Sequence, residues 1–151
     1  MSRTNTNLQL RPHQNNALNV LRRDWKKYST HLLQAPVGAG KTAIAAEIMA
    51  GLSSNGIRSL FVAPYVTLVE QTAKAFMDYG LNQPAIIWRD HPWHDPDNLI
   101  QIASADTLIR RDFPDVDVVI IDECHIKRAK LLKMMACLLY TSDAADDASS
   151  V

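Results

Sequence analysis

Two short motifs, separated by 80 residues between Thr42 and Asp122, constrain this 151-residue chain more than any other feature. The first, at residues 35–42, is a loop of small residues that ends in Gly-Lys-Thr. It follows an apolar run and precedes a segment with strong helical propensity. The second, Asp122-Glu123, directly follows the β-branched run 116–121. A strand, a tight glycine-rich loop and a helix are the context in which backbone N–H groups bind phosphates.

The first motif carries the groups that bind a nucleoside triphosphate. Lys41 is expected to reach the terminal phosphates, and the Thr42 hydroxyl is expected to bind Mg²⁺. Ala35 stands where the G-x-x-x-x-G-K-[ST] pattern has its first glycine, which is a mild departure. The predicted nucleotide contacts in this loop are Pro36, Val37, Gly38, Ala39, Gly40, Lys41 and Thr42.

The second motif supplies acidic groups at the carboxyl end of a buried strand, where open α/β sheets bind ligands. Asp122 is expected to hold Mg²⁺ through its water shell, and Glu123 to orient and deprotonate the attacking water. Either motif alone is often only a turn or a helix start. Their order and context together predict an ATP and Mg²⁺ site with Lys41, Asp122 and Glu123 as the catalytic residues.

Composition is that of an ordinary globular domain, with 47% hydrophobic and 21% charged residues. No apolar run approaches the roughly 20 residues that cross a bilayer, so no membrane association is expected. The first residues contain no secretory apolar region, and Cys124 and Cys137 offer no disulfide framework or metal-ligand spacing. These features favour a cytoplasmic protein.

Strands and helices are predicted to alternate, which indicates βαβ units and a mostly parallel sheet with helices on both faces. The expected strands are residues 30–35, 59–63, 85–88, 99–103 and 116–121. The expected helices are 12–28, 41–53, 66–79, 107–111 with Asp106 as its cap, and 127–136. Residues 89–98 form a polar loop, in which Trp93 is expected to pack the loop down. His91, His94 and Asp95 lack a further ligand pair, so we expect no metal there.

The last segment differs in character from the rest. Residues 137–146 read like the in-frame translation of a transposase adapter used in sequencing libraries. We therefore expect the domain to occupy residues 8–136, truncated at its C-terminus, and residues 137–151 to be a non-native tail. The alternative is a natural disordered acidic tail rich in Ala and Ser.

Five segments, in order, resemble the first RecA-like domain of a superfamily 2 helicase of the DEAD/DEAH-related type. They cover nearly all of residues 8–136: residues 10–14, 35–42, 62–71, 102–108 and 122–125. The third usually has Pro-Thr where this chain has Pro64-Tyr65. The two nucleotide motifs occur in many ATPases, whereas the series of five is far more specific.

This resemblance implies further roles. Gln14 would pair with the adenine edge, and His125 would couple the ATP site to the nucleic-acid side. Pro64, Tyr65, Thr107 and Arg110 would contact the nucleic-acid backbone, of DNA in preference to RNA, without reading base sequence. Tyr65 could instead cover a strand end, and Arg110 could be a solvated helix end. Hydrolysis would require a second RecA-like domain in cis, so the chain alone is expected to bind ATP weakly.

The predicted function is therefore the N-terminal domain of an ATP-dependent helicase or translocase. One alternative is the translocating subunit of a restriction or chromatin-remodelling enzyme, where strands need not separate. A phage DNA-packaging ATPase would not need Gln14 or the Asp-Glu-Cys-His form of residues 122–125. A non-hydrolysing, nucleotide-dependent binding module is the third alternative, and the presence of Glu123 argues against it.

Overall fold

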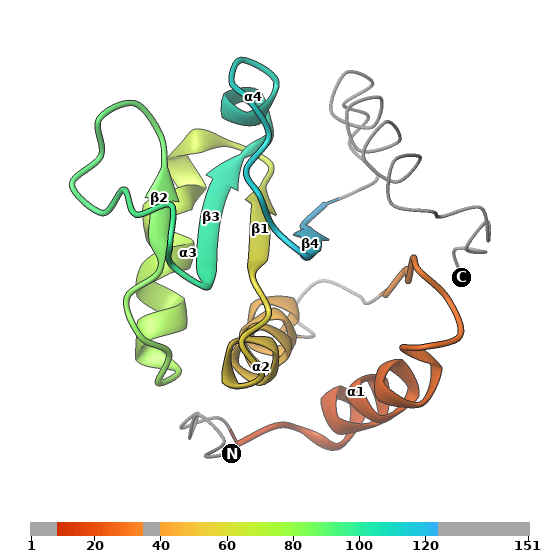
Figure 1. The fold of residues 1–151 in the computed structure, drawn as a ribbon. Coiled ribbons are helices and arrows are strands. Elements are labelled where there is room, and N and C mark those ends of the chain that lie inside the picture. Colours follow the sequence, from red (N-terminus) through yellow and green to blue (C-terminus); the bar gives the residue numbers. More distant parts are fainter. Residues whose placement is uncertain (1–8, 35–39, 124–151) are drawn as a thin grey trace.

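A parallel sheet forms the centre of the computed structural model, which describes residues 9–34 and 40–123 (Figure 1). Its strands are β1 (Ser59–Ala63), β2 (Ala85–Ile87), β3 (Ile100–Ser104) and β4 (Val118–Ile121). They lie in the order β2-β3-β1-β4, and all three pairings are parallel. The prediction of a mostly parallel sheet is confirmed.

The register brings the carboxyl ends of the four strands to one level. Ala63 at the end of β1 lies opposite Ser104 at the end of β3. Ile87 lies opposite Ala103, and Val62 lies opposite Ile121. Residues that follow these strands, including Asp122 and Trp88, therefore emerge at the same edge of the sheet. In such folds this edge is where ligands bind.

Two helices, α2 (Lys41–Ser54) and α3 (Val69–Asp78), cover one face of the sheet (Figure 1). The short helix η1 (Val66–Leu68) leads into α3. Met49 of α2 and Phe76 of α3 are fully buried, and the Phe76 ring meets Phe61 of β1 edge to face at 5.4 Å. Burial of a side chain of this size contributes roughly 1.5–3 kcal/mol to folding. This face is the main core of the molecule.

The opposite face is covered by the short helix α4 (Ala105–Leu108) and the chain that follows it. Leu108 is fully buried against β1 and β3 residues, and Phe113 packs beside it. The prediction of helices on both faces is confirmed. The helix itself begins two residues earlier than predicted. Its N-cap is Ser104, whose hydroxyl accepts a hydrogen bond from the Thr107 N–H, and not Asp106 as expected.

Helix α1 (Pro12–Asp24) lies beside α2, away from the sheet (Figure 1). Pro12 occupies its first turn, as predicted, and Leu18 is its buried apolar contact. The helix stops at Asp24, four residues before the predicted end. Arg22 approaches Glu47 of α2 to 3.9 Å across this junction.

The predicted strand at residues 30–35 is wrong for its described part. Residues 30–34 form no strand, and Leu32 and Leu33 are about half exposed. His31 instead stacks on Trp25 at the end of α1, with ring centroids 5.5 Å apart and planes 3° from parallel. Strand formation needs a neighbour for the backbone hydrogen bonds, and this stack keeps the segment at the end of α1. The described sheet has four strands and not five.

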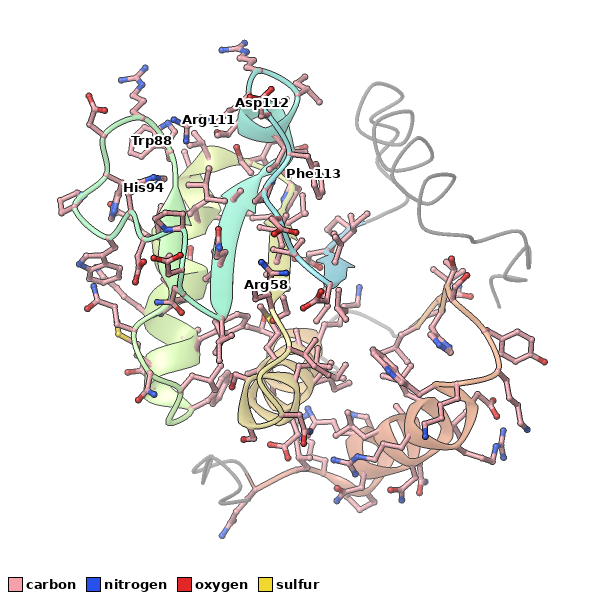
Figure 2. All side chains as sticks on the ribbon, in the orientation of Figure 1. Arg58, Trp88, His94, Arg111, Asp112 and Phe113 are labelled. Carbon is pink, nitrogen blue, oxygen red and sulfur yellow. The ribbon has the colours of Figure 1, made fainter. Side chains whose placement is uncertain are left out.

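A cluster of charges ties the amino ends of β1 and β4 together. The Arg58 guanidinium donates from Nη1 to Asp115 Oδ2 at 2.7 Å, while the Arg58 backbone N–H donates to Asp117 Oδ2. This hydrogen bond to the Asp115 carboxylate raises the pKa of the Arg58 guanidinium. Figure 2 labels Arg58 at the end of the sheet opposite Trp88 and Arg111. This cluster therefore lies far from the carboxyl edge and acts on strand pairing.

Two predicted segments fall outside the described residues: the helix at 127–136 and the tail at 137–151. Within residues 9–34 and 40–123, no helix combines the length and the apolar character that a membrane crossing requires.

Candidate nucleotide and nucleic-acid site

Gly40 joins the phosphate-loop motif to α2, and its backbone is in the left-handed region with φ +77°. A Cβ atom at this position would collide with the Gln14 side-chain amide. Only glycine meets both conditions without strain. The left-handed backbone is therefore what favours glycine at this position, and any Cβ there would also displace the Gln14 amide.

Gln14 is 4% exposed, and its amide is engaged on both sides. Its Oε1 accepts a hydrogen bond from the Arg11 N–H at 2.8 Å, and its Nε2 donates to the Gly40 carbonyl at 3.2 Å. A buried amide without such partners would be costly. Gln14 thus connects the start of α1 to the end of the phosphate loop. The family resemblance predicts that Gln14 reads the adenine, but no sequence signal predicted its link to Gly40.

Lys41 and Glu123 come together although 82 positions separate them in the chain. Lys41 Nζ lies 3.9 Å from Glu123 Oε1, and both side chains are about one-third exposed. A partly exposed pair at this distance contributes little stability. Its meaning is spatial: the start of α2 and the end of β4 share one site. Glu123 also has φ +53°, a conformation that is costly for a residue with a side chain and that often marks functional positions.

Asp122 and Thr42 are the residues expected to hold Mg²⁺. The Asp122 N–H donates to the Val62 carbonyl at 3.0 Å, which fixes the main chain where β4 ends. Thr42 is the second residue of α2, and both side chains are partly accessible. Magnesium prefers oxygen ligands and is usually held by one or two carboxylates together with phosphate oxygens and waters. The Thr42 hydroxyl at the start of α2 and the Asp122 carboxylate at the end of β4 are oxygen groups of the kind that this ion prefers.

The predicted nucleic-acid contacts follow β1 and β3, the two central strands. Tyr65 is 49% exposed, whereas Pro64 is buried, so Tyr65 presents the larger surface to solvent. The Thr107 hydroxyl accepts a hydrogen bond from the Ser104 hydroxyl at 2.9 Å, which leaves its own proton available for donation. Arg110 is exposed just beyond α4. The structure therefore places all four at the carboxyl edge.

Several predicted site residues lie outside the described ranges. They are Pro36, Val37, Gly38 and Ala39 of the phosphate loop, and His125 after the acidic pair. Of the predicted nucleotide and catalytic residues, the structure describes Gln14, Gly40, Lys41, Thr42, Asp122 and Glu123. Within the described part of the chain, no group of three or more His, Cys, Asp or Glu residues could hold a metal by itself.

Sequence reasoning missed the Ser104 cap, although a serine three residues before Thr107 is a recognisable signal. It also missed the left-handed backbone at Glu123 and the pairing of His91 with Glu70. The latter two depend on tertiary placement, for which the sequence carries no local signal.

The chain matches the family model described as type III restriction enzyme, res subunit, over residues 7–145. A comparison with curated proteins gave no match. Among solved structures, the SWI2/SNF2 ATPase core of Sulfolobus solfataricus in complex with dsDNA is similar, with a TM-score of 0.70 and 17% identity. That similarity covers 89% of this chain and 31% of the other.

Two further structures have the same fold. The UvsW helicase from bacteriophage T4 gives a TM-score of 0.68 at 18% identity, covering 91% of this chain and 51% of the helicase. A nuclease-deletion mutant of the type ISP restriction-modification enzyme LlaGI, in complex with a DNA substrate mimic, gives a TM-score of 0.61 at 20% identity. That similarity covers 83% of this chain and 16% of the other. The chain thus spans 16–51% of the length of these three structures.

Since the family match covers most of its length, the chain belongs to the type III restriction enzyme res-subunit family, and its fold is that of the first RecA-like domain of a superfamily 2 helicase.

Proposed function

We propose that this chain is the ATP-binding first domain of a nucleic-acid motor, formed by residues 8–136 and acting with a second RecA-like domain in cis. The observation that carries the proposal is the 3.9 Å approach of Lys41 Nζ to Glu123 Oε1. It brings the end of the phosphate-loop motif and the acidic motif into one site. Membership of a helicase-type family supports the same reading.

In this proposal ATP is the substrate, and its phosphates lie at the start of α2. Lys41 stabilises the charge that develops on the transferred phosphoryl group. Thr42 and Asp122 hold Mg²⁺, which when bound supplies Lewis-acid polarisation of phosphate oxygens. Glu123 orients the attacking water and accepts its proton. Gln14 pairs with the adenine edge. Its hydrogen bond to the Gly40 carbonyl connects the adenine-binding side to the phosphate loop.

The nucleic-acid side is proposed to run across the ends of β1 and β3. Tyr65, Thr107 and Arg110 contact the backbone there, with Pro64 shaping the turn below Tyr65, and His125 couples this side to the ATP site. Contacts to phosphate and sugar carry no sequence information, which suits a motor that moves along any sequence. DNA is the favoured track because two of the similar structures are described as complexes with DNA or a DNA mimic.

A Glu123→Gln variant of the full-length motor tests the proposal. General-base removal costs about 10²- to 10⁴-fold in rate, so we expect DNA-stimulated ATP hydrolysis to fall by at least about 100-fold while ATP binding is retained. Equal hydrolysis by wild type and variant would show that Glu123 is not the base. It would favour a nucleotide-dependent binding module instead.

A second candidate is translocation along duplex DNA without strand separation. The specific support is the restriction-enzyme family match, together with structural similarity to a SWI2/SNF2 ATPase core. In the full-length protein, ATP-dependent displacement of a third strand from a DNA triplex, with no unwinding of a duplex, would favour this candidate. Unwinding of a duplex would favour the helicase.

A further inference from the structure

A hollow of about 640 Å³ lies between α3 and the loop that follows β2. Its volume is within the roughly 300–1,000 Å³ range of small-molecule sites. The lining residues are Glu70 and Lys74 of α3 and the loop residues Trp88, Arg89, Asp90, His91, Pro92 and Trp93. None of these residues has a role in the ATP site described above.

The loop is held in place by many hydrogen bonds. The Ile86 N–H of β2 donates to the Trp93 carbonyl at 2.9 Å, so the loop folds back along the outer edge of the sheet. The Gln101 amide of β3 donates to the carbonyls of Pro96 and Asn98. Such a loop presents its side chains in a fixed arrangement.

His91 fixes the wall between the loop and α3. Its Nδ1 accepts a hydrogen bond from the Trp93 N–H at 3.0 Å, so its proton is on Nε2, which lies 2.9 Å from Glu70 Oε1. The ring is 9% exposed. Glu70 is in the first turn of α3, directly after the segment that contains Tyr65. The hollow is therefore connected to the proposed nucleic-acid side by one short stretch of chain.

Aromatic and guanidinium groups dominate the chemistry of the hollow. The Arg89 guanidinium lies over the Trp88 ring, 5.4 Å from its centroid, and Arg89 is exposed. Trp88 and Trp93 pack partly against the core, which anchors them. The planar guanidinium of Arg89 is held near the indole and is exposed, so it can offer a flat face to another π-system.

The backbone at Arg89 has φ +46°, which is unusual for a bulky residue. A conformation of this kind persists only where the surroundings impose it, and it occurs preferentially at binding sites. Here it places the side chain back over Trp88. The lining charges, Lys74 and Arg89 against Glu70 and Asp90, balance to zero. The hollow thus suits a flat, neutral ring and not a phosphate.

The position of the hollow agrees with this chemistry. Ile87 pairs with Ala103, so the next residue, Trp88, lies at the level of Ser104. Ser104 caps α4, the helix that contains Thr107. Figure 2 shows Trp88 and Arg111 at the same end of the sheet. A strand that crosses Tyr65 and Thr107 away from the ATP site reaches the Trp88 loop next.

We propose that this hollow binds an unpaired nucleobase of the DNA strand, stacked on the Arg89–Trp88 pair. The inference rests on the proposed function and adds to it a contact with a base, in place of backbone contacts alone. Stacking is tolerant of sequence because every base has a flat π-face. The hollow therefore holds the strand without selecting a sequence.

The test uses the 151-residue chain and two fluorescent probes of about 12 nucleotides, one a single-stranded DNA and the other the same backbone without bases. Fluorescence anisotropy gives the affinity for each. Wild type is expected to bind the base-bearing probe at least about fivefold more tightly. Raising the salt concentration is expected to weaken both affinities while leaving their ratio unchanged, because stacking releases no counterions.

Variants locate the effect. Arg89→Ala and Arg89→Lys are expected to bring the ratio close to one, because neither residue offers a planar face. Trp88→Leu should also bring the affinity ratio close to one. If Trp88→Leu unfolds the loop, the two Arg89 variants alone provide the test. Lys26→Ala removes one exposed positive charge from the end of α1, so it should keep the ratio.

A ratio near one in wild type, or no binding of either probe, would overturn the inference. An affinity ratio that stays high in both Arg89 variants would also overturn the inference. If that ratio were then lost in Tyr65→Ala, the stacking would be assigned to Tyr65. Arg89 follows the strand at one edge of the sheet and Asp122 the strand at the other. The Arg89 and Trp88 variants should therefore bind ATP as wild type does. If wild type itself failed to bind ATP, that result would count against the proposed function and not against the base-binding hollow.

Discussion

Gly40 shows how one residue can be dictated by two independent constraints. Its φ of +77° starts α2 from a left-handed turn, and the Gln14 amide occupies the space where a Cβ would lie. The loop motif and the start of α1 are therefore built to fit each other at this point. Gly51, in the last turn of α2, has an ordinary backbone and open space around the Cβ position.

Gly40→Ala is expected to destabilise the domain, because the left-handed conformation alone costs roughly 1–2 kcal/mol for a residue with a Cβ. Displacement of Gln14 adds to this. Gly51→Ala, the matched control, is expected to stabilise by about 0.5–1 kcal/mol, because alanine favours helix interiors. Urea unfolding of both variants measures the difference. Similar free energies of unfolding for the two variants would contradict the described geometry at Gly40.

Gln14→Ala removes the acceptor for the Arg11 N–H and the donor to the Gly40 carbonyl, in a buried position. We expect a loss of about 1–3 kcal/mol in the free energy of unfolding. We also expect a loss of the preference for ATP over GTP, if preference is measured by competition for a labelled nucleotide. Asn15→Ala, at the exposed neighbouring position, is the control. An unchanged preference for ATP over GTP would show that Gln14 does not read the adenine, although its link to Gly40 would stand.

At the scale of elements, α4 depends on its N-cap residue, Ser104. Ser104 accepts a hydrogen bond from the Thr107 N–H and donates one to the Thr107 hydroxyl. Helix α4 is only four residues long, so this cap fixes both the helix and the orientation of Thr107. The predicted cap, Asp106, lies on the exposed side of the same turn.

Ser104→Ala should therefore cost about 0.5–2 kcal/mol in the free energy of unfolding. Asp106→Ala removes only a favourable charge near a helix start, so its cost should stay below about 1 kcal/mol. Thermal or urea unfolding of both variants distinguishes the caps. A larger loss of unfolding free energy for Asp106→Ala than for Ser104→Ala would show that Asp106 is the cap, as the sequence predicted.

The elements that sequence patterns predicted well are those with a purely local cause. β1 is buried along its whole length, and Gly80, with φ +98°, ends α3 as expected of a residue after a helix. Residues 30–34 were also predicted to form a strand, but they form none. Their conformation depends on the His31–Trp25 stack and on which strands are available for pairing. The joining of Gln14 to Gly40 and of His91 to Glu70 likewise depends on tertiary contacts.

At the scale of the whole molecule, the order of strands separates two proposed activities. The proposed ATP-site residues follow β4 and begin α2, whereas the proposed nucleic-acid contacts follow β1 and β3, and the hollow beside Trp88 follows β2. Lys and Arg together number 16, and so do Asp and Glu, so net charge gives no general attraction to nucleic acid. The proposed binding to DNA is therefore expected to come from groups placed along this one edge.

ATP binding to wild type and to Lys41→Ala shows whether the loop motif and the acidic motif form one ATP site. Titration of a fluorescent ATP analogue with Mg²⁺ should show saturable binding by wild type and weakening of at least about tenfold in the variant, or roughly 1.4 kcal/mol. Lys26→Ala should bind as wild type does. Equal affinity of wild type and Lys41→Ala would contradict the account.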